Sequence, residues 1–385
     1  MKRINTLELI SKNPVTPECP CRPARRREAA EAGGESRKRC LDSRLRQAGM
    51  TLVRGTAFLR LLLVLLTLLM VCSVSFAQVK SKVSLIGGDD VPQLKKQFET
   101  TLEAVLLEMN KIQKKTGDVG ALKQYFSSEA LETFRQYVLQ NGAYTARKQY
   151  SPLVVARENG QYYDVRSITV KVNLGQTEAS DSQNLIFTFA RSGQIVSVRS
   201  MLPNYDFQSV ISTAKSPQDS VMRGRILDFL EEFRMAYNTK KSEFLEKVFS
   251  DEALIIVGSV LQEKKSTDDL YRGSSLSSSK VKLIQQTKKE YLDGLKNKAF
   301  KNNSFINVRF DDVNILQHEK IPEVYGVTCW QQWASSSYKD KGFLFLMVDF
   351  RNPKEPTIHV RTWQPNPFED GSFVSMYDFD VIKYE

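Results

Sequence analysis

Histidine and cysteine are scarce in this sequence. Its 385 residues include 2 histidines and 5 cysteines. Two histidines are too few for an ordinary zinc site without carboxylate help, so we expect no metal and no other cofactor. Four cysteines precede residue 78, namely Cys19, Cys21, Cys40 and Cys72. Only Cys329 follows, so the rest of the chain lacks a partner for an internal disulfide and its fold depends on its core.

The sequence also lacks the common catalytic motifs. It contains no Gly-rich phosphate loop, no G-x-S-x-G elbow and no H-E-x-x-H pair. These absences remove the main sequence signals for nucleotide-binding proteins, serine hydrolases and zinc proteases. We therefore expect a protein without catalytic activity rather than an enzyme.

The formal net charge of +11 is concentrated near the N-terminus. Residues 1–77 hold 14 of the 55 Lys and Arg residues but 6 of the 44 Asp and Glu residues. The remaining 41 basic and 38 acidic residues give the chain after residue 77 a net charge of about +3. No concentrated basic face with interleaved aromatics remains there, so we expect no nucleic-acid partner.

Residues 50–77 have the pattern of a secretory signal peptide. A basic start at Arg54 and Arg60 precedes an apolar run, Leu61–Val71, and Ser75–Ala77 supplies small residues before Gln78. The run is shorter than the ~20 residues that span a bilayer, which favours cleavage after Ala77 over an uncleaved anchor. We expect an exported protein, in the periplasm or at the cell surface, that meets the membrane only through this segment.

Two alternatives concern the same end of the chain. A lipid anchor on Cys72 would require a small residue where Val71 stands. Residues 1–49 are rich in Arg and Pro and show no apolar period, which is typical of a disordered basic extension. Because such an extension does not suit an exported protein, we hypothesise that Met50 is the true start. A peptide from residues 1–49 in the precursor would refute this.

Two short motifs occur twice in the same order. FSSEAL (Phe126–Leu131) precedes VRSMLPN (Val198–Asn204), and FSDEAL (Phe249–Leu254) precedes VRTWQPN (Val360–Asn366). The second pair is 39 residues further apart, and the Ser-rich stretch 266–279 is a natural place for part of that excess. The repetition predicts an internal duplication with an insertion in the second copy.

Each predicted copy begins with helical periodicity and ends with strand periodicity. Apolar residues recur at helical spacing over 94–112 and 121–139, then over 226–248 and 288–300. Strand patterns follow over 153–157, 162–173, 185–191 and 195–201, and over 253–261, 305–316, 324–333, 342–350 and 357–364. This order predicts an α+β fold of two tandem cone domains, each with N-terminal helices packed in a curved antiparallel sheet.

The expected divisions follow from these patterns. They are a basic extension at 1–49, a signal peptide at 50–77, a first cone at 92–204, a polar linker at 205–219 and a second cone at 220–385 with the insertion 266–279. Residues 373–384 add a further strand-like segment.

The layout resembles that of the nuclear-transport-factor-2-like superfamily of cystatin-like α+β cones. The blocks INVRFDDV (Ile306–Val313), YGVT (Tyr325–Thr328), GFLFLMVDF (Gly342–Phe350) and IHVRTWQP (Ile358–Pro365) are also similar to a family of exported proteins from Bacteroidota-type bacteria. These resemblances imply export and a cone whose concave mouth holds a ligand or active site. They imply no particular activity.

The best candidate site lies on the last strand of the second cone. Alternation places His359, Arg361 and Trp363 on one face of 357–364, and Asp349 ends the preceding strand. A His359–Asp349 pair suits acid–base chemistry, and Arg361 suits an anionic group. Gln331 and Trp333 complete the candidate ligand-binding set.

A structural reading of the same residues stays open. His359 and Arg361 would then face solvent, with Asp349 as a cross-strand partner. Arg199 and Arg361 occupy the same place in the two VR motifs, which favours a structural role that pairs a carboxylate.

These observations favour an exported, non-catalytic binding or assembly protein of the bacterial cell envelope. Its partner would be an envelope protein or a small ligand. The alternatives are a small-molecule isomerase or hydrolase-like enzyme, and a glycan or peptide binder, each using the mouth of the second cone.

Overall fold

A computed structural model describes residues 80–145, 147–172, 182–261 and 280–379. The expected basic extension, signal peptide and Ser-rich insertion lie outside the described residues. The described chain forms helices and two larger sheets, one of four strands in the order β3-β4-β5-β6 and one of six in the order β8-β7-β12-β11-β10-β9. Within these two sheets neighbouring strands run antiparallel except β12 and β7, which are parallel. The expected α+β class is confirmed.

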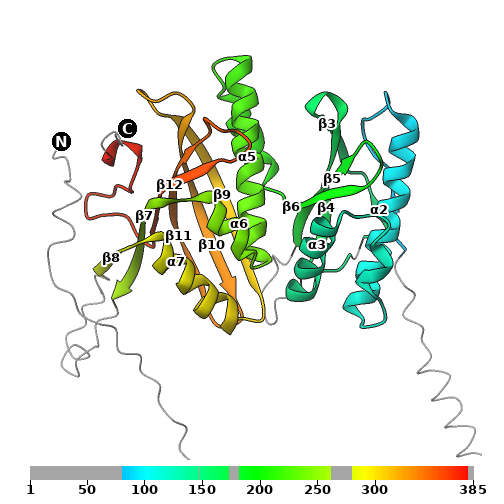
Figure 1. Ribbon diagram of the computed structural model, residues 1–385, viewed down its shortest axis with the longest axis horizontal. Coiled ribbons are helices and arrows are strands. Elements are labelled where there is room, and N and C mark those ends of the chain that lie inside the picture. The colour runs from blue at the N-terminus through cyan, green and yellow to red at the C-terminus, as the bar shows by residue number, and fades with distance from the viewer. Residues whose placement is uncertain (1–79, 146, 173–181, 262–279, 380–385) are drawn as a thin grey trace, which may run out of the picture. The chain divides into compact units, whose positions relative to one another are not determined.

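The first half packs two helices on its sheet (Figure 1). The helices are α2 (Pro92–Gln113) and α3 (Ser128–Asn141), and the strands are β3 (Leu153–Arg157), β4 (Tyr162–Lys171), β5 (Ser182–Ala190) and β6 (Ile195–Ser200). The Ser127 side chain caps α3, and Gly142 ends it at a positive φ of 55°. Both helices bury an apolar face in one core that includes Phe98, Phe134 and Phe187.

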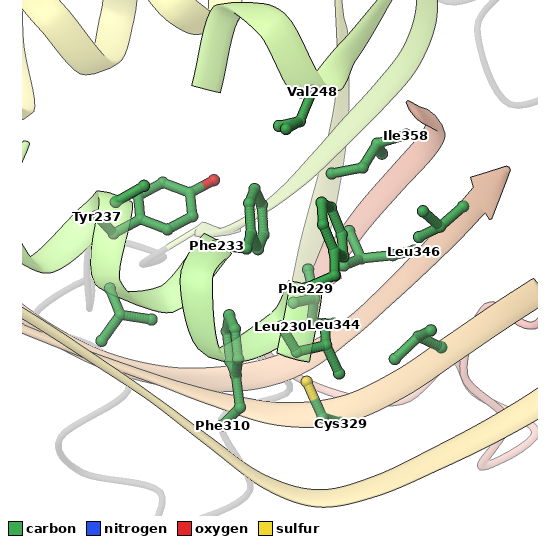
Figure 2. Packing of buried hydrophobic residues seen from close by; sticks show 14 of the residues in the cluster. Phe229, Leu230, Phe233, Tyr237, Val248, Phe310, Cys329, Leu344, Leu346 and Ile358 are labelled. Carbon is green, nitrogen blue, oxygen red and sulfur yellow. The ribbon is translucent and has the colours of Figure 1, made fainter. Parts of the chain in front are cut away.

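The second half places a long helix along its sheet. The helices are α5 (Pro217–Asn238), α6 (Ser242–Val248) and α7 (Lys288–Gly294), and the strands are β7 (Phe249–Leu261), β8 (Lys280–Gln286), β9 (Ile306–Gln317), β10 (Val324–Ser335), β11 (Lys339–Asp349) and β12 (Thr357–Gln364). Figure 2 shows Phe229, Phe233 and Tyr237 along α5 in the same core as Leu344 and Leu346 of the sheet. This second core is distinct from the first.

Short elements complete the described chain. They are β1 (Lys82–Val83), η1 (Val119–Leu122), β2 (Gln149–Tyr150), η2 (Glu158–Gly160), α4 (Asn204–Ser212), the π-helix η4 (Leu295–Phe300) and η5 (Met376–Asp378).

Two local expectations are corrected. The segment expected as a polar linker contains α4, whose Val210 is 3% exposed and whose Phe207 packs on the second core. Residues 373–379 form a loop and η5 rather than a strand, because Val374 and Met376 pack on the outer face of the sheet.

The repeated motifs differ in structure. Ser128–Leu131 of FSSEAL begins α3, whereas all of FSDEAL lies in β7. Each motif's phenylalanine pairs in parallel with the last strand of its half, Phe126 with Ile195 and Phe249 with Ile358. The paired strands β7 and β8 lie where the described part of the first half has a single bridge, and they contribute to the wider motif spacing. The likeness between the halves is one of element order, and duplication stays a prediction.

Candidate functional site

Four of the predicted site residues meet on the inner face of the second sheet. Gln331 pairs across strands with Phe310, and Arg361 pairs with Leu346. Trp363 pairs with Leu344, and all three apolar partners belong to the second core. Trp333 packs on the same core from β10. Cross-strand partners share one side of a sheet, so these four residues face the helices.

Arg361 is the charged centre of this group. Its side chain is buried, and the residue is 5% exposed. The guanidinium carbon lies 4.9 Å from the ring centroid of Tyr291 on α7. Nη2 donates to the Gln331 side-chain oxygen over a long 3.4 Å. Among the described residues, no carboxylate oxygen lies within 4.0 Å of its nitrogens. The Tyr237 side chain also forms a hydrogen bond with Arg361. The buried cation is therefore held by two tyrosines and a neutral amide.

Several polar atoms around Arg361 lack hydrogen-bond partners within the described chain. They are Nε and Nη1 of Arg361, Nε1 of Trp363 and Oδ1 of Asp340. Leaving a buried donor unpaired typically costs about 1–3 kcal/mol, and more for a charged group. Native structures accept that cost where a ligand, ion or water completes the bonds.

Two tyrosines and an aspartate complete the group, which we call the Arg361 cluster: Tyr237, Tyr291, Gln331, Trp333, Asp340, Arg361 and Trp363. The Tyr237 and Tyr291 hydroxyl oxygens are 2.6 Å apart. Asp340 is the cross-strand partner of Trp333, and both are partly exposed. Burial raises the pKa of Asp340, although the Tyr338 hydroxyl and the charge of Arg361 oppose this. The cluster therefore lies where the inner face meets solvent.

Gly342 gives Trp363 its place in the cluster. A Cβ at residue 342 would lie 2.5 Å from the Trp363 ring and 2.6 Å from the Gln364 carbonyl oxygen. Only a glycine leaves room for the indole against the neighbouring strand. The sequence alone contained no signal for this contact.

Asp349 and His359 meet elsewhere. His359 is the extra residue of a β-bulge, because Met347 pairs with Val360 and the next residue, Val348, pairs with Ile358. The bulge breaks the alternation expected for β12. Ile358 belongs to the inner core and Val360 to the outer cluster, so His359 does not share the face of Arg361.

The His359–Asp349 contact is weak. The His359 Nε2 and Asp349 Oδ2 atoms are 3.4 Å apart. Asp349 is already engaged by Arg351, whose Nη2 and Nε donate at 2.6 and 2.9 Å and whose backbone N–H donates at 2.8 Å. Burial lowers the pKa of His359 despite the neighbouring carboxylate. His359 is two residues from Arg361 along β12, but it contacts Asp349, which follows Met347 of the outer cluster by two residues on β11. The pair therefore lies on the other face of the sheet from Arg361 and does not serve the Arg361 cluster.

Arg199 has a structural environment. Its nitrogens lie 2.6 Å from Asp164, 2.9 Å from Asp228 and 3.8 Å from Glu231. Val198 belongs to the first core, so Arg199 faces away from that core, whereas Arg361 faces into the second. The shared VR motif therefore does not place its arginines equivalently. The expected carboxylate pairing holds for Arg199 and not for Arg361.

Tyr237, Tyr291 and Asp340 were absent from the predicted site. Tyr237 and Tyr291 have helical spacing that indicates core packing, and their hydroxyls become neighbours only when α5 and α7 meet the sheet. The described residues contain no group of three or more His, Cys, Asp or Glu side chains arranged for a metal ion. No described helix is long and apolar enough to cross a membrane.

No family model matches the chain, and no curated protein sequence matches it. Similar solved structures include naphthalene 1,2-dioxygenase with indole bound in the active site, at 10% identity and a TM-score of 0.29 over 43% of this chain and 88% of that one. ActVI-ORFA from Streptomyces coelicolor matches at 10% identity and 0.25, over 36% and 94%. Bd1075 from Bdellovibrio bacteriovorus matches at 11% identity and 0.28, over 57% and 94%.

These likenesses are too distant to carry a function. Each half begins with a long helix and ends with four strands, as the nuclear-transport-factor-2-like resemblance implies, but in the second half β7 and β8 precede α7. Membership of a Bacteroidota family and export stay predictions.

Proposed function

We propose that this chain is an exported, non-catalytic ligand-binding protein of the bacterial cell envelope, and that the inner face of its second sheet holds a small ligand. The observation that carries the proposal is the buried guanidinium of Arg361 beside Trp363, whose Nε and Nη1 atoms lack hydrogen-bond partners in the described chain. A bound ligand would complete hydrogen bonds that the described protein leaves open.

The arrangement of the acid–base pair supports binding over catalysis. Asp349 is held by Arg351, and His359 lies on a bulge outside the inner face. A general base must lie within reach of the proton that it abstracts from the substrate, and a partner must orient the base. The 3.4 Å contact between His359 and Asp349 is the one observation that favours the isomerase or hydrolase-like alternative.

Native mass spectrometry tests the binding part of the proposal. The full chain is produced in a bacterial host and purified from its envelope fraction without denaturation. The expected result is an additional small-molecule mass on the protein that is lost from Arg361→Gln. A retained mass in that variant, or its loss from His359→Ala alone, would contradict the proposed site.

Export needs its own measurement. N-terminal sequencing of the same envelope sample is expected to begin at Gln78. Recovery of the chain in the cytoplasm with residues 50–77 intact would refute the proposed location without affecting the ligand site.

A further inference from the structure

We infer that the Arg361 cluster binds the carboxylate of a small aromatic acid. This inference rests on the proposed function and adds the chemical class of the ligand. It comes from the charge, the free donors and the ring surfaces of the cluster.

The free donors select an anion. Nε and Nη1 of Arg361 carry positive charge, and Nε1 of Trp363 is a third N–H group without an acceptor in the described chain. Hydrogen bonds from a guanidinium to a carboxylate are about twice as strong as those between neutral groups. The long 3.4 Å contact to Gln331 is readily replaced by such an acceptor.

The charge balance selects a single negative charge. Arg361 is the only cation among the seven residues of the cluster, and Asp340, whose charge interacts with Arg361, is its only carboxylate. A second negative charge on the ligand would find no further cation and would be repelled by Asp340. A carboxylate therefore suits the cluster better than a phosphate group, which carries more than one charge near neutral pH.

The surfaces around the donors select a flat, apolar body. Tyr291 lies under the guanidinium, and the Tyr237 and Trp333 rings meet edge to face at 5.9 Å. Trp363 lies against the backbone of Gly342 and is 6% exposed. Aromatic rings favour stacked or edge-on contact with another ring, which adds to the free energy of burying it.

Isothermal titration calorimetry with the full chain tests the inference, with benzoate, its neutral isostere benzamide, and inorganic phosphate as probes. The expected result is that benzoate binds at least about tenfold more tightly than benzamide or phosphate. Benzamide lacks the charge for a charge-assisted hydrogen bond, and phosphate carries additional charge that the cluster does not compensate. Arg361→Gln is expected to weaken benzoate binding at least about tenfold.

Two further variants keep the result interpretable. Arg351→Gln removes an arginine from the Asp349 site and should leave benzoate binding unchanged. Trp363→Phe keeps an aromatic ring and removes the Nε1 donor, so it should weaken benzoate binding even if Arg361→Gln fails to fold.

Equal binding of benzoate and benzamide would overturn the carboxylate assignment and leave the proposed function standing. Failure of all three probes to bind would overturn the ligand class, while a small-molecule mass retained by the purified protein would still support the proposed function. Equal loss of benzoate binding in Arg351→Gln and Arg361→Gln would show that benzoate does not bind at the Arg361 cluster.

Discussion

The guanidinium of Arg361 lies 4.9 Å above the ring centroid of Tyr291, on the inner face of the second sheet. Arg199, its counterpart in sequence, lies 2.6 Å from the carboxylate of Asp164. One arginine has its counter-ion built into the fold, and the other does not within the described residues. This contrast is the basis for our proposal that Arg361, unlike Arg199, binds a ligand.

The carboxylate of Asp164 should be essential for stability. It is 1% exposed and contacts Arg199 at 2.6 Å and the Thr188 hydroxyl at 2.7 Å. Asp164→Ala leaves buried arginine charge uncompensated, so we expect a loss of about 3–5 kcal/mol in the free energy of unfolding. Urea denaturation measures it. The matched change Glu132→Ala removes the exposed partner of Arg135 and should cost about 0–1 kcal/mol.

The contribution of Asp164 should depend on pH. Burial alone would raise its pKa, but Arg199, Thr188 and further arginines outweigh burial, so the pKa lies below the ordinary value of 3.8. A lowered carboxyl pKa stabilises the folded state above the unfolded pKa and loses that effect as pH falls through the folded pKa. The stability gap between the native chain and Asp164→Asn should therefore narrow below about pH 4. A difference in the free energy of unfolding between these two proteins that grows as the pH falls would contradict the lowered pKa of Asp164.

Asp206 should have the opposite pH dependence. Burial, with the charges of Asp311 and Asp312, raises its pKa to about 6. Its Oδ1 accepts the Val313 N–H at 3.2 Å, and its Oδ2 has no partner in the described chain. A carboxyl group whose pKa is raised on folding lowers the free energy of unfolding when the pH is above its folded-state pKa. It has no such effect when the pH is below its unfolded-state pKa.

The variant Asp206→Asn keeps the acceptor and removes the charge. We expect its urea midpoint to exceed that of the native chain at pH 8 and to approach it at pH 4. Lower stability of the variant at pH 8 would show that the ionised carboxylate is favourable there.

Gly342 offers a test of the packing that holds Trp363. Gly342→Ala would place a Cβ 2.5 Å from the indole, so we expect a loss of about 1–3 kcal/mol from overpacking and a changed tryptophan emission. Gly294→Ala is the control, because no atom lies within 4 Å of its added Cβ. That helical position should gain up to about 1 kcal/mol. Equal changes in the free energy of unfolding for Gly342→Ala and Gly294→Ala would contradict the close contact between Gly342 and Trp363.

The contact between His359 and Asp349, the predicted acid–base pair, can be tested through the pKa of His359. Burial lowers the pKa of His359 below 6.5, while the Asp349 carboxylate raises it. Removing the charge in Asp349→Asn should therefore lower the His359 pKa further, as followed by NMR titration of the ring protons. A rise in that pKa would mean that the carboxylate does not stabilise the protonated ring.

Periodicity predicted the regular part of the fold. Leu153–Arg157 and Thr357–Gln364 have the bounds expected from their alternating residues. Helix α4 was missed because its short stretch is polar, with Phe207 and Val210 as sparse apolar positions at helical spacing. The motif FSSEAL was misleading because the same residue types cap a helix in one half and continue a strand in the other.

The candidate site was predictable in composition and not in geometry. Residue type singled out Arg361 and Trp363, and strand alternation paired them correctly. Alternation failed at His359 because a bulge adds one residue to β12, and one extra residue moves a side chain to the other face. Tyr237 and Tyr291 come from separate helices, 54 residues apart, so only the packed structure brings them to the arginine.

The most direct test of the ligand site is a crystal structure of the protein purified from the bacterial envelope, at a resolution that shows ordered water. We expect non-protein density within hydrogen-bond distance of Nε or Nη1 of Arg361, bounded by Trp363 and Tyr291. Arg361 paired instead with a protein carboxylate, with no foreign molecule beside it, would contradict the proposed ligand site.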